Sequence, residues 1–420
     1  TGTVSGGTFS IDVDGSDLAA DSDTTIYAAV TTTDAAGNST KAIDTEGYSV
    51  DTTAASAPTV MITEDADDDG FINSSELSGD VNVEITLPGD AVAGDTLTVS
   101  DGSTTQTFVL SAADILSGSV LTTFTPPAEG GTITVTASVT DEAGNPGPSA
   151  NDSATVDTSI NAGITLASNI TSDDVINATE AGGTIAVTGS VSGDVQDGDT
   201  VTLTVNGKAF TGTVAGGTFS IDVPGSDLVA DSDSIVDASV STTDTAGNSV
   251  TATDTEGYAV DTTAPLAPTV TITEDVDNDG FINSSELSGP VNVQIDLPVG
   301  AVAGDTLVVT DVTTPQTIVL TATHIFNGNV TTTFASPGDR NAINVTAVIT
   351  DIAGNVGSSA SDSALIDVTP PAATITLDSD ITADDVINAT EAGSTIAITG
   401  ATGGDVQPGD TVTLVINTKT

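Results

Sequence analysis

Short runs in which apolar and polar residues alternate dominate the chain, and they predict β-strands. Within residues 159–262 we count about seven runs, and Asn206-Gly207 and Gly216-Gly217 supply turns between them. Seven short strands in about 105 residues are typical of an immunoglobulin-like β-sandwich. Helical turns are expected at 226–230 and 111–116. We therefore expect an all-β fold whose strands in this unit lie at 163–168, 184–191, 199–206, 208–214, 218–223, 235–243 and 250–260.

Internal repetition shows how such units are arranged. The string that begins at Thr1 returns at Thr211, and the string at Thr63 returns at Thr273; we call this spacing the long period. The motif Asp-x-Ala-Gly-Asn and the linkers that resemble Val50-Asp51-Thr52-Thr53 divide the long period into two alternating types of unit. We expect a tandem, end-to-end array: the C-terminal half of a repeat at 1–53, whole repeats at 54–158, 159–262 and 263–367, and the N-terminal half of a repeat at 368–420.

The two terminal halves are complementary. Residues 368–420 stop after the strand that ends near Ile416, and residues 1–53 resume at the strand that would follow it. Half a sandwich exposes unpaired strand edges and apolar faces, which favours association. We therefore predict that terminal halves of neighbouring chains complete one another.

Composition narrows the possible functions. The chain has 60 Asp and Glu against 4 Lys and Arg, a formal charge of -56. Nucleic acid and anionic membranes need clustered basic residues, so neither is an expected partner. Because 37% of the residues are hydrophobic, a folded chain is favoured over disorder. The chain has no cysteine and no apolar run that approaches the length of a membrane span, so we expect no disulfide, no thiolate chemistry and no direct membrane insertion.

Two acidic loops have the pattern of calcium ligands. Calcium prefers several oxygen ligands, a backbone carbonyl at loop position 7, a glycine at position 6 and a carboxylate at position 12. We call 65–76 and 275–286 the full loops. Their predicted ligands are Asp65, Asp67, Asp69, Phe71, Asn73 and Glu76, and Asp275, Asp277, Asp279, Phe281, Asn283 and Glu286. An Asp-rich solvated turn is the alternative.

The other type of unit has a weaker version of the same loop. We call 169–180 and 380–391 the degenerate loops, because they have fewer charges and lack the glycine. We expect them to bind calcium more weakly or to borrow ligands; a plain polar turn is again the alternative. Their candidate ligands are Asp173, Asp174 and Glu180, and Asp384, Asp385 and Glu391.

Strand direction predicts where these loops meet. Successive antiparallel strands alternate in direction, so the calcium-like loop faces the next unit, as does the acidic loop that carries Asp227, Asp231 and Asp233. The Asp-x-Ala-Gly-Asn loop faces the previous unit. The alternative is that this loop is a plain hairpin turn whose Asp binds no metal. Each junction would thus gather one linker Asp and one hairpin Asp as further metal ligands. These are Asp51, Asp157, Asp261 and Asp367 in the linkers, and Asp141, Asp244 and Asp351 in the hairpins.

These motifs together resemble a known family. The repeats of about 105 residues, the Val-Asp-Thr-Thr linkers, the Asp-x-Ala-Gly-Asn hairpins and the Asp-x-Ile-Asn-x-x-Glu loops are similar to the bacterial immunoglobulin-like extender repeats of giant RTX adhesins. The resemblance covers the whole chain. It implies type I secretion, an extracellular place at the bacterial cell surface, and a non-enzymatic stalk that calcium makes rigid and that holds a distal ligand-binding domain away from the cell.

Other functions remain to be weighed. An enzyme would need a catalytic constellation, yet the one histidine, His324, stands where the related unit has Asp114, and we expect it at the surface. A calcium-dependent adhesion or carbohydrate-binding module with homophilic contacts is the alternative, although sugar sites usually present exposed aromatic residues and this chain has no Trp. A third reading takes the acidity as adaptation to salt, in which case calcium would have no effect.

Overall fold

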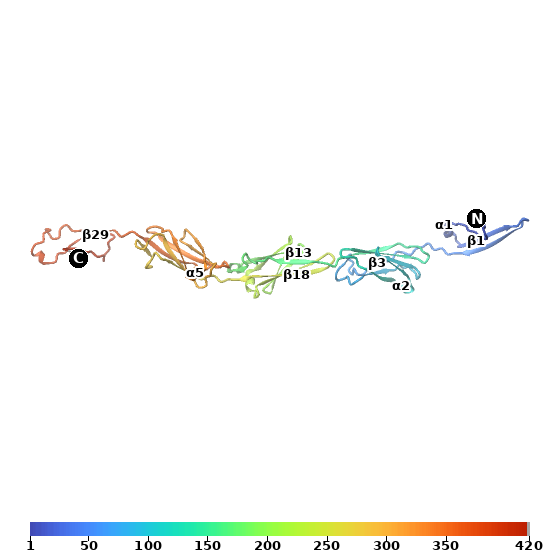
Figure 1. The fold of residues 1–420 in the computed structure, drawn as a ribbon, viewed down its shortest axis with the longest axis horizontal. Helices are drawn as coiled ribbons and strands as arrows, with labels where there is room; N and C mark the ends of the chain where they lie inside the picture. The colour runs from blue at the N-terminus through green and yellow to red at the C-terminus, as the bar shows by residue number, and fades with distance from the viewer. Residues whose placement is uncertain (418–420) are drawn as a thin grey trace.

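The chain forms a row of β-sandwiches. The structure is a computed structural model that describes residues 1–417. Figure 1 shows the sandwiches end to end in one extended rod, with the two termini in its two end segments. Within the described residues, buried side chains form three separate clusters, which lie inside 55–156, 164–258 and 270–366. We call 54–158, 159–262 and 263–367 the first, second and third unit; their exact boundaries stay predictions.

The first and third units share one topology. In the first unit the sheet β3-β5-β8 faces the sheet β4-β10-β9-β6-β7, and the third unit repeats this with β20-β22-β25 and β21-β27-β26-β23-β24. The first unit consists of β3 (Thr59–Ile62), β4 (Phe71–Ile72), β5 (Val81–Thr86), β6 (Thr96–Ser100), β7 (Thr105–Val109), α2 (Ala112–Ser117), β8 (Ser119–Phe124), β9 (Thr132–Thr140) and β10 (Ala150–Val156). The third unit consists of β20 (Thr269–Ile272), β21 (Phe281–Asn283), β22 (Val291–Asp296), β23 (Thr306–Thr310), β24 (Gln316–Val319), α5 (Ala322–Asn327), β25 (Asn329–Phe334), β26 (Ala342–Thr350) and β27 (Ala360–Asp367).

The second unit follows the same plan with longer strands. Its sheets are β11-β13-β16 and β15-β14-β17-β18, with a short parallel pair of β12 and β19. Its elements are β11 (Ala162–Leu166), β12 (Val175–Ile176), α3 (Ala178–Ala181), β13 (Thr184–Gly193), β14 (Thr200–Val205), β15 (Lys208–Thr213), β16 (Thr218–Pro224), α4 (Gly225–Ala230), β17 (Ile235–Thr243), β18 (Ser249–Gly257) and β19 (Ala259–Val260). The expected all-β sandwich is confirmed, as are the helical turns, which form α4 and α2.

Alternation of side chains explains the cores. In β5, Val81, Val83 and Ile85 are buried while the residues between them face outward, as the two-residue period of a strand requires. Phe219 and Tyr258 are buried in the second unit, as predicted. His324 is the third residue of α5, and its Nδ1 accepts a hydrogen bond from the Thr321 amide. The histidine therefore caps this helix, as the Asp114 carboxylate caps α2.

One expected strand is divided. The segment 250–260 was predicted as one strand, but β18 ends at Gly257 and the chain then changes partner. The Ala259 amide donates to the Asp174 carbonyl at 2.9 Å, so β19 pairs in parallel with β12. Tyr258 lies between the two pieces, where its hydroxyl donates to the Leu228 carbonyl at 2.8 Å. The chain therefore changes strand partner next to this buried ring.

The terminal segments carry half a sandwich each. The N-terminal one contains α1 (Gly15–Ala20), β1 (Thr25–Thr33) and β2 (Ser39–Gly47), and the C-terminal one contains β28 (Ala373–Leu377), the 3₁₀ turn η1 (Glu391–Gly393) and β29 (Gly400–Gly404). Phe9 is 63% exposed, whereas Phe219, which stands one long period later, is 4% exposed. Ile11 and Ile221 differ in the same way. Residues that form the core of a whole unit are thus open to solvent here.

Candidate metal loops at the unit junctions

Each full loop is anchored beside a linker. In the 65–76 loop, β4 pairs in parallel with β10: the Thr155 amide donates to Gly70 O at 2.9 Å and the Asp157 amide donates to Ile72 O at 3.1 Å. Successive carbonyls of an extended chain point in opposite directions, so the Phe71 carbonyl turns away from β10. Ile72 is fully buried. This short strand therefore ties the loop to the last residues before the next unit.

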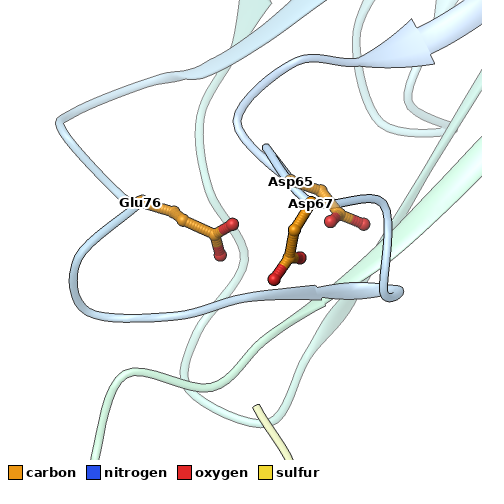
Figure 2. Close-up of side chains that lie close together, drawn as sticks. All are labelled: Asp65, Asp67 and Glu76. Carbon is orange, nitrogen blue, oxygen red and sulfur yellow. The ribbon is translucent and has the colours of Figure 1, made fainter. Parts of the chain in front are cut away.

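The carboxylates of the full loops converge. Figure 2 shows Asp65 and Asp67 side by side, with Glu76 pointing toward them from the other side of the loop. One oxygen from each of these three side chains lies within 4.8 Å of the others, and Asp275, Asp277 and Asp279 form the same kind of group in the third unit. Two unit charges about 4 Å apart interact by about 4 kcal/mol at an effective dielectric near 20. A divalent cation with oxygen ligands would convert this repulsion into attraction, which is the arrangement that calcium prefers.

The backbone of the full loop is built for this convergence. Asp68 and Gly70 have φ of 58° and 90°, and Asn278 and Gly280 repeat the left-handed conformation at 56° and 87°. Both oxygens of Asp65 accept amide hydrogen bonds, from Asp69 at 3.1 Å and Gly70 at 3.0 Å. The side chain is 8% exposed, and burial raises its pKa. The first predicted ligand is therefore held in place by backbone amides of its own loop.

The end of the loop is closed by Asn73 and Glu76. Glu76 accepts from the Ala66 amide at 3.0 Å and from the Asn73 amide at 2.9 Å, so its carboxylate links the two ends of the loop. The Asn73 side-chain oxygen accepts from the amide and the hydroxyl of Ser75 at 2.9 and 2.7 Å. Asn73 thus caps a turn in this structure. Asn283 and Glu286 make the same turn in the 275–286 loop.

The sequence analysis missed Glu64, a buried residue that accepts hydrogen bonds from the residues after this turn. Glu64 precedes the first predicted ligand and is 5% exposed. It accepts from the Ser78 amide at 2.8 Å, from the Ser78 hydroxyl at 2.9 Å and from the Asn82 side chain. Burial acts to raise its pKa, but these hydrogen bonds outweigh it and hold the pKa of Glu64 below its usual value. The sequence did contain a signal for this residue, because Glu274 stands at the equivalent position one long period later.

The degenerate loops are closed by hydrogen bonds of their own. The Thr171 hydroxyl lies 3.1 Å from Asp173 Oδ1 and 3.2 Å from the Val175 carbonyl oxygen, and it can donate to either. Asp174 occupies the glycine position with φ of 62°, and its carboxylate accepts from the Ile170 amide at 3.0 Å. Glu180 accepts from the Asn177 amide at 3.0 Å. The predicted ligands Asp173 and Asp174 therefore bond to their own loop.

The 380–391 loop repeats this arrangement. The Thr382 hydroxyl lies 3.3 Å from Asp384 Oδ1 and 3.2 Å from the Val386 carbonyl. Asp385 accepts from the Ile381 amide at 3.0 Å, and Glu391 accepts from the Asn388 amide at 3.0 Å. Within residues 1–417, three carboxylates come within 4.8 Å of one another in the two full loops and in neither degenerate loop.

The calcium-like loop of one unit touches the hairpin of the next. At the first joint, between the first and second units, the Ser74 amide donates to Asn248 Oδ1 at 2.8 Å and Asn248 Nδ2 donates to the Asp157 carbonyl at 2.8 Å. At the second joint, between the second and third units, the Ala178 amide donates to Asn355 Oδ1 at 2.7 Å and Asn355 Nδ2 donates to the Asp261 carbonyl at 2.8 Å. One asparagine side chain thus joins three segments at each joint.

The hairpin aspartates hold these asparagines. Asp244 Oδ1 accepts from the Asn248 amide at 2.9 Å, and its Oδ2 accepts from Asn248 Nδ2 at 3.0 Å. Asp351 and Asp141 bind Asn355 and Asn145 in the same way. Hydrogen bonds from Asn145 lower the pKa of Asp141. In this structure the carboxylates position the asparagines.

The linker aspartates lie in different surroundings. Burial, followed by the nearby charge of Asp244, raises the pKa of Asp157. Asp51 and Asp261 accept from the amides of Thr53 and Thr263, both at 3.0 Å. Asp367 ends β27, opposite Asn283 of β21. The structure therefore brings a linker and a hairpin carboxylate together at the first joint, without a third one within 4.8 Å among the described residues.

A further acidic residue at the first joint was missed. Glu129 accepts from the hydroxyls of Thr158 and Ser159, both at 2.8 Å, and these bonds lower its pKa to about 2. Asp339 stands one long period later and accepts from the Val368 amide at 2.8 Å. Asp227, in the acidic loop that was expected to face the next unit, forms an ion pair with Lys208 at 2.6 Å.

Comparison with known proteins relates this geometry to adhesins. No protein-family model and no curated protein matches the chain. A solved structure of a calcium-stabilised adhesin, with which an Antarctic bacterium reaches out and binds ice, is 38% identical; the match covers 87% of this chain and 87% of that chain, with a TM-score of 0.49. Another, from work on host cell-surface retention of a 1.5-MDa bacterial ice-binding adhesin, is 29% identical over 74% of this chain and 98% of that chain, with a TM-score of 0.48.

A single solved domain is also similar to part of this chain. The bacterial immunoglobulin-like domain of the M. primoryensis ice-binding adhesin is 48% identical, and the match covers 24% of this chain and 98% of that domain, with a TM-score of 0.22. Among described residues, no helix is long and apolar enough to cross a membrane. Identity of 38% over most of both chains, together with the tandem sandwiches and their acidic loops, settles the family. The chain belongs to the bacterial immunoglobulin-like extender repeats of large RTX adhesins, and its cofactor is calcium.

Proposed function

We propose that this chain is a non-enzymatic stalk segment of an extracellular adhesin at the bacterial surface, in which calcium bound at the unit junctions makes the rod rigid. The contact from Ser74 through Asn248 to the Asp157 carbonyl carries the proposal. The side chain of Asn248, which belongs to the next unit, bonds to both the full loop and the linker. An ion that orders the loop therefore also orders the joint.

The full loops supply the principal ligands. We propose that Asp65, Asp67, Asp69, the Phe71 carbonyl and Glu76 hold one ion, with Asn73 at the edge of the site, and that the 275–286 loop does the same with Asp275, Asp277, Asp279, Phe281, Asn283 and Glu286. The converging carboxylates support this assignment. At a calcium concentration of a hundred times the dissociation constant, each site adds about 2.7 kcal/mol to the folded state. This is a large share of the net stability of a small domain, about 5 to 15 kcal/mol.

The junction carboxylates are the second part of the proposal. Burial and then the charge of Asp244 raise the pKa of Asp157, and the hydroxyls of the two residues that follow Asp157 donate to Glu129. We propose that a cation at the first joint draws on Asp157 and Asp244. The corresponding linker and hairpin aspartates of the other joints are Asp51, Asp261 and Asp367, and Asp141 and Asp351.

Small-angle scattering of the chain with calcium and with EGTA tests the stalk function. We expect the maximum dimension to fall and the conformational spread to rise when calcium is removed, because the linkers are then free to bend. Magnesium added in place of calcium, with EGTA present, controls for ionic strength. An unchanged scattering curve would contradict a calcium-rigidified stalk.

A further inference from the structure

The two joints of the long period reach the same contact by different routes. Both end in a buried asparagine: Asn248 is 4% exposed and Asn355 is 3% exposed. Both asparagines accept a hydrogen bond from a backbone amide in the turn at loop positions 9 to 12. The donor is Ser74 at the first joint and Ala178 at the second. The asparagine and the turn are therefore common to both joints, whereas the first halves of the two loops differ.

In the full loop, the residue that shapes this turn is also part of the charged group. Glu76 accepts from the Asn73 amide and so fixes the position of Ser74. The same carboxylate lies within 4.8 Å of Asp65 and Asp67. Without a cation, the repulsion acts on the side chain that shapes the docking turn. A divalent cation among these oxygens would convert the repulsion into attraction.

In the degenerate loop, no group of three carboxylates converges on the turn among the described residues. Glu180 makes the equivalent bond to Asn177, and the Asn177 side chain accepts from the amides of Thr179 and Glu180 at 2.9 and 3.0 Å. Upstream, the Thr171 hydroxyl lies against the carbonyl at position 7, which in a calcium loop would be a ligand. The Val175 carbonyl can therefore accept a hydrogen bond from its own loop, where a calcium loop would offer this carbonyl to the ion.

We propose that the joints alternate: the first joint docks only when calcium neutralises the 65–76 loop, whereas the second joint is held by the hydrogen-bonded 169–180 loop and needs no ion in that loop. This rests on the proposed function and adds where along the rod calcium acts. The 275–286 and 380–391 loops repeat the two designs one long period later. A longer array of this period would lose rigidity at every second joint.

Label pairs placed across each joint of the whole chain test this proposal. The chain has no cysteine, so Thr107→Cys with Ser220→Cys reports on the first joint, and Ser220→Cys with Thr317→Cys reports on the second. The three positions face solvent on β7, β16 and β24. We expect chelation to broaden the spin-label distance distribution about twofold across the first joint, as for an unsupported linker, and to leave the second unchanged.

The outcomes separate the two proposals. If neither distribution responds to chelation, calcium rigidification itself fails. If both broaden equally, the alternation fails and the stalk function stands. A chain with Asn169→Asp, Thr171→Asp and Asp174→Gly provides the reciprocal test: with these full-loop residues, the second joint should gain sensitivity to chelator, and its continued indifference would overturn the role given to the threonine.

Discussion

The 65–76 and 169–180 loops have the same place in successive units and dock on the same kind of hairpin, yet one is closed around converging carboxylates and the other around a threonine hydroxyl. Their shared features are the short strand against the end of the last strand, the buried isoleucine, and the Asn-x-x-Glu turn. The comparison separates two tasks within one short loop. The second half of the loop contacts the next unit. The first half determines whether this contact depends on calcium or on hydrogen bonds within the loop.

The largest effect should come from a feature that both loops share. Ile72 and Ile176 are both fully buried where the loop enters the core. Ile72→Ala and Ile176→Ala should each lower the free energy of unfolding of their unit by about 2 to 5 kcal/mol, because a cavity replaces the side chain. Calorimetry in calcium measures the change. Met61→Ala, at a 54% exposed position of β3, is the control, and equal losses at Met61 and Ile72 would contradict the anchoring role.

The next effect should divide the two loops. Glu76→Gln keeps the shape of the side chain but removes a charge from the carboxylate group, so we expect most of the calcium stabilisation of the first unit, about 2.7 kcal/mol at saturating ion, to be lost. Glu180→Gln is the matched variant in the degenerate loop. Titration calorimetry with calcium should show one site fewer for the first substitution and no change for the second. Equal losses would mean that both loops bind the ion alike.

Much of this comparison follows from the sequence, and the rest depends on contacts that the sequence does not display. Alternation located strands such as β13, and strand direction placed the loops and hairpins at facing ends of neighbouring units. The two-residue strand β4 is too short to produce a periodic pattern. The bond from Ser74 to Asn248 joins residues 174 positions apart, so nothing local distinguishes Asn248 from an ordinary turn residue. Glu129 was missed because its role depends on the hydroxyls of Thr158 and Ser159, although an acid also stands one long period later.

A smaller effect should come from the hairpin side chain common to both joints. Asn248→Ala removes a buried acceptor from the Ser74 amide and a donor from the Asp157 carbonyl, and unsatisfied buried groups cost about 1 to 3 kcal/mol. Hydrogen exchange of the Ser74 amide should accelerate accordingly. Asn38→Ala is the control, because Asn38 makes the same bonds to Asp34 and, among the described residues, none to a preceding unit. Exchange at Ser74 that stays slow would show that the asparagine does not hold the joint.

The smallest effect isolates the threonine. Thr171→Val preserves the branched shape and deletes the hydroxyl that lies between the Asp173 carboxylate and the Val175 carbonyl, so we expect a loss of about 0.5 to 1.5 kcal/mol in the second unit. The loss should be the same in calcium and in EGTA, because a hydrogen bond holds this loop closed and no ion is needed. Thr179→Val, whose side chain is exposed beside the same turn, should change little. A loss that calcium restores would mean that the degenerate loop still binds the ion, and the difference between the joints would then be one of affinity instead of mechanism.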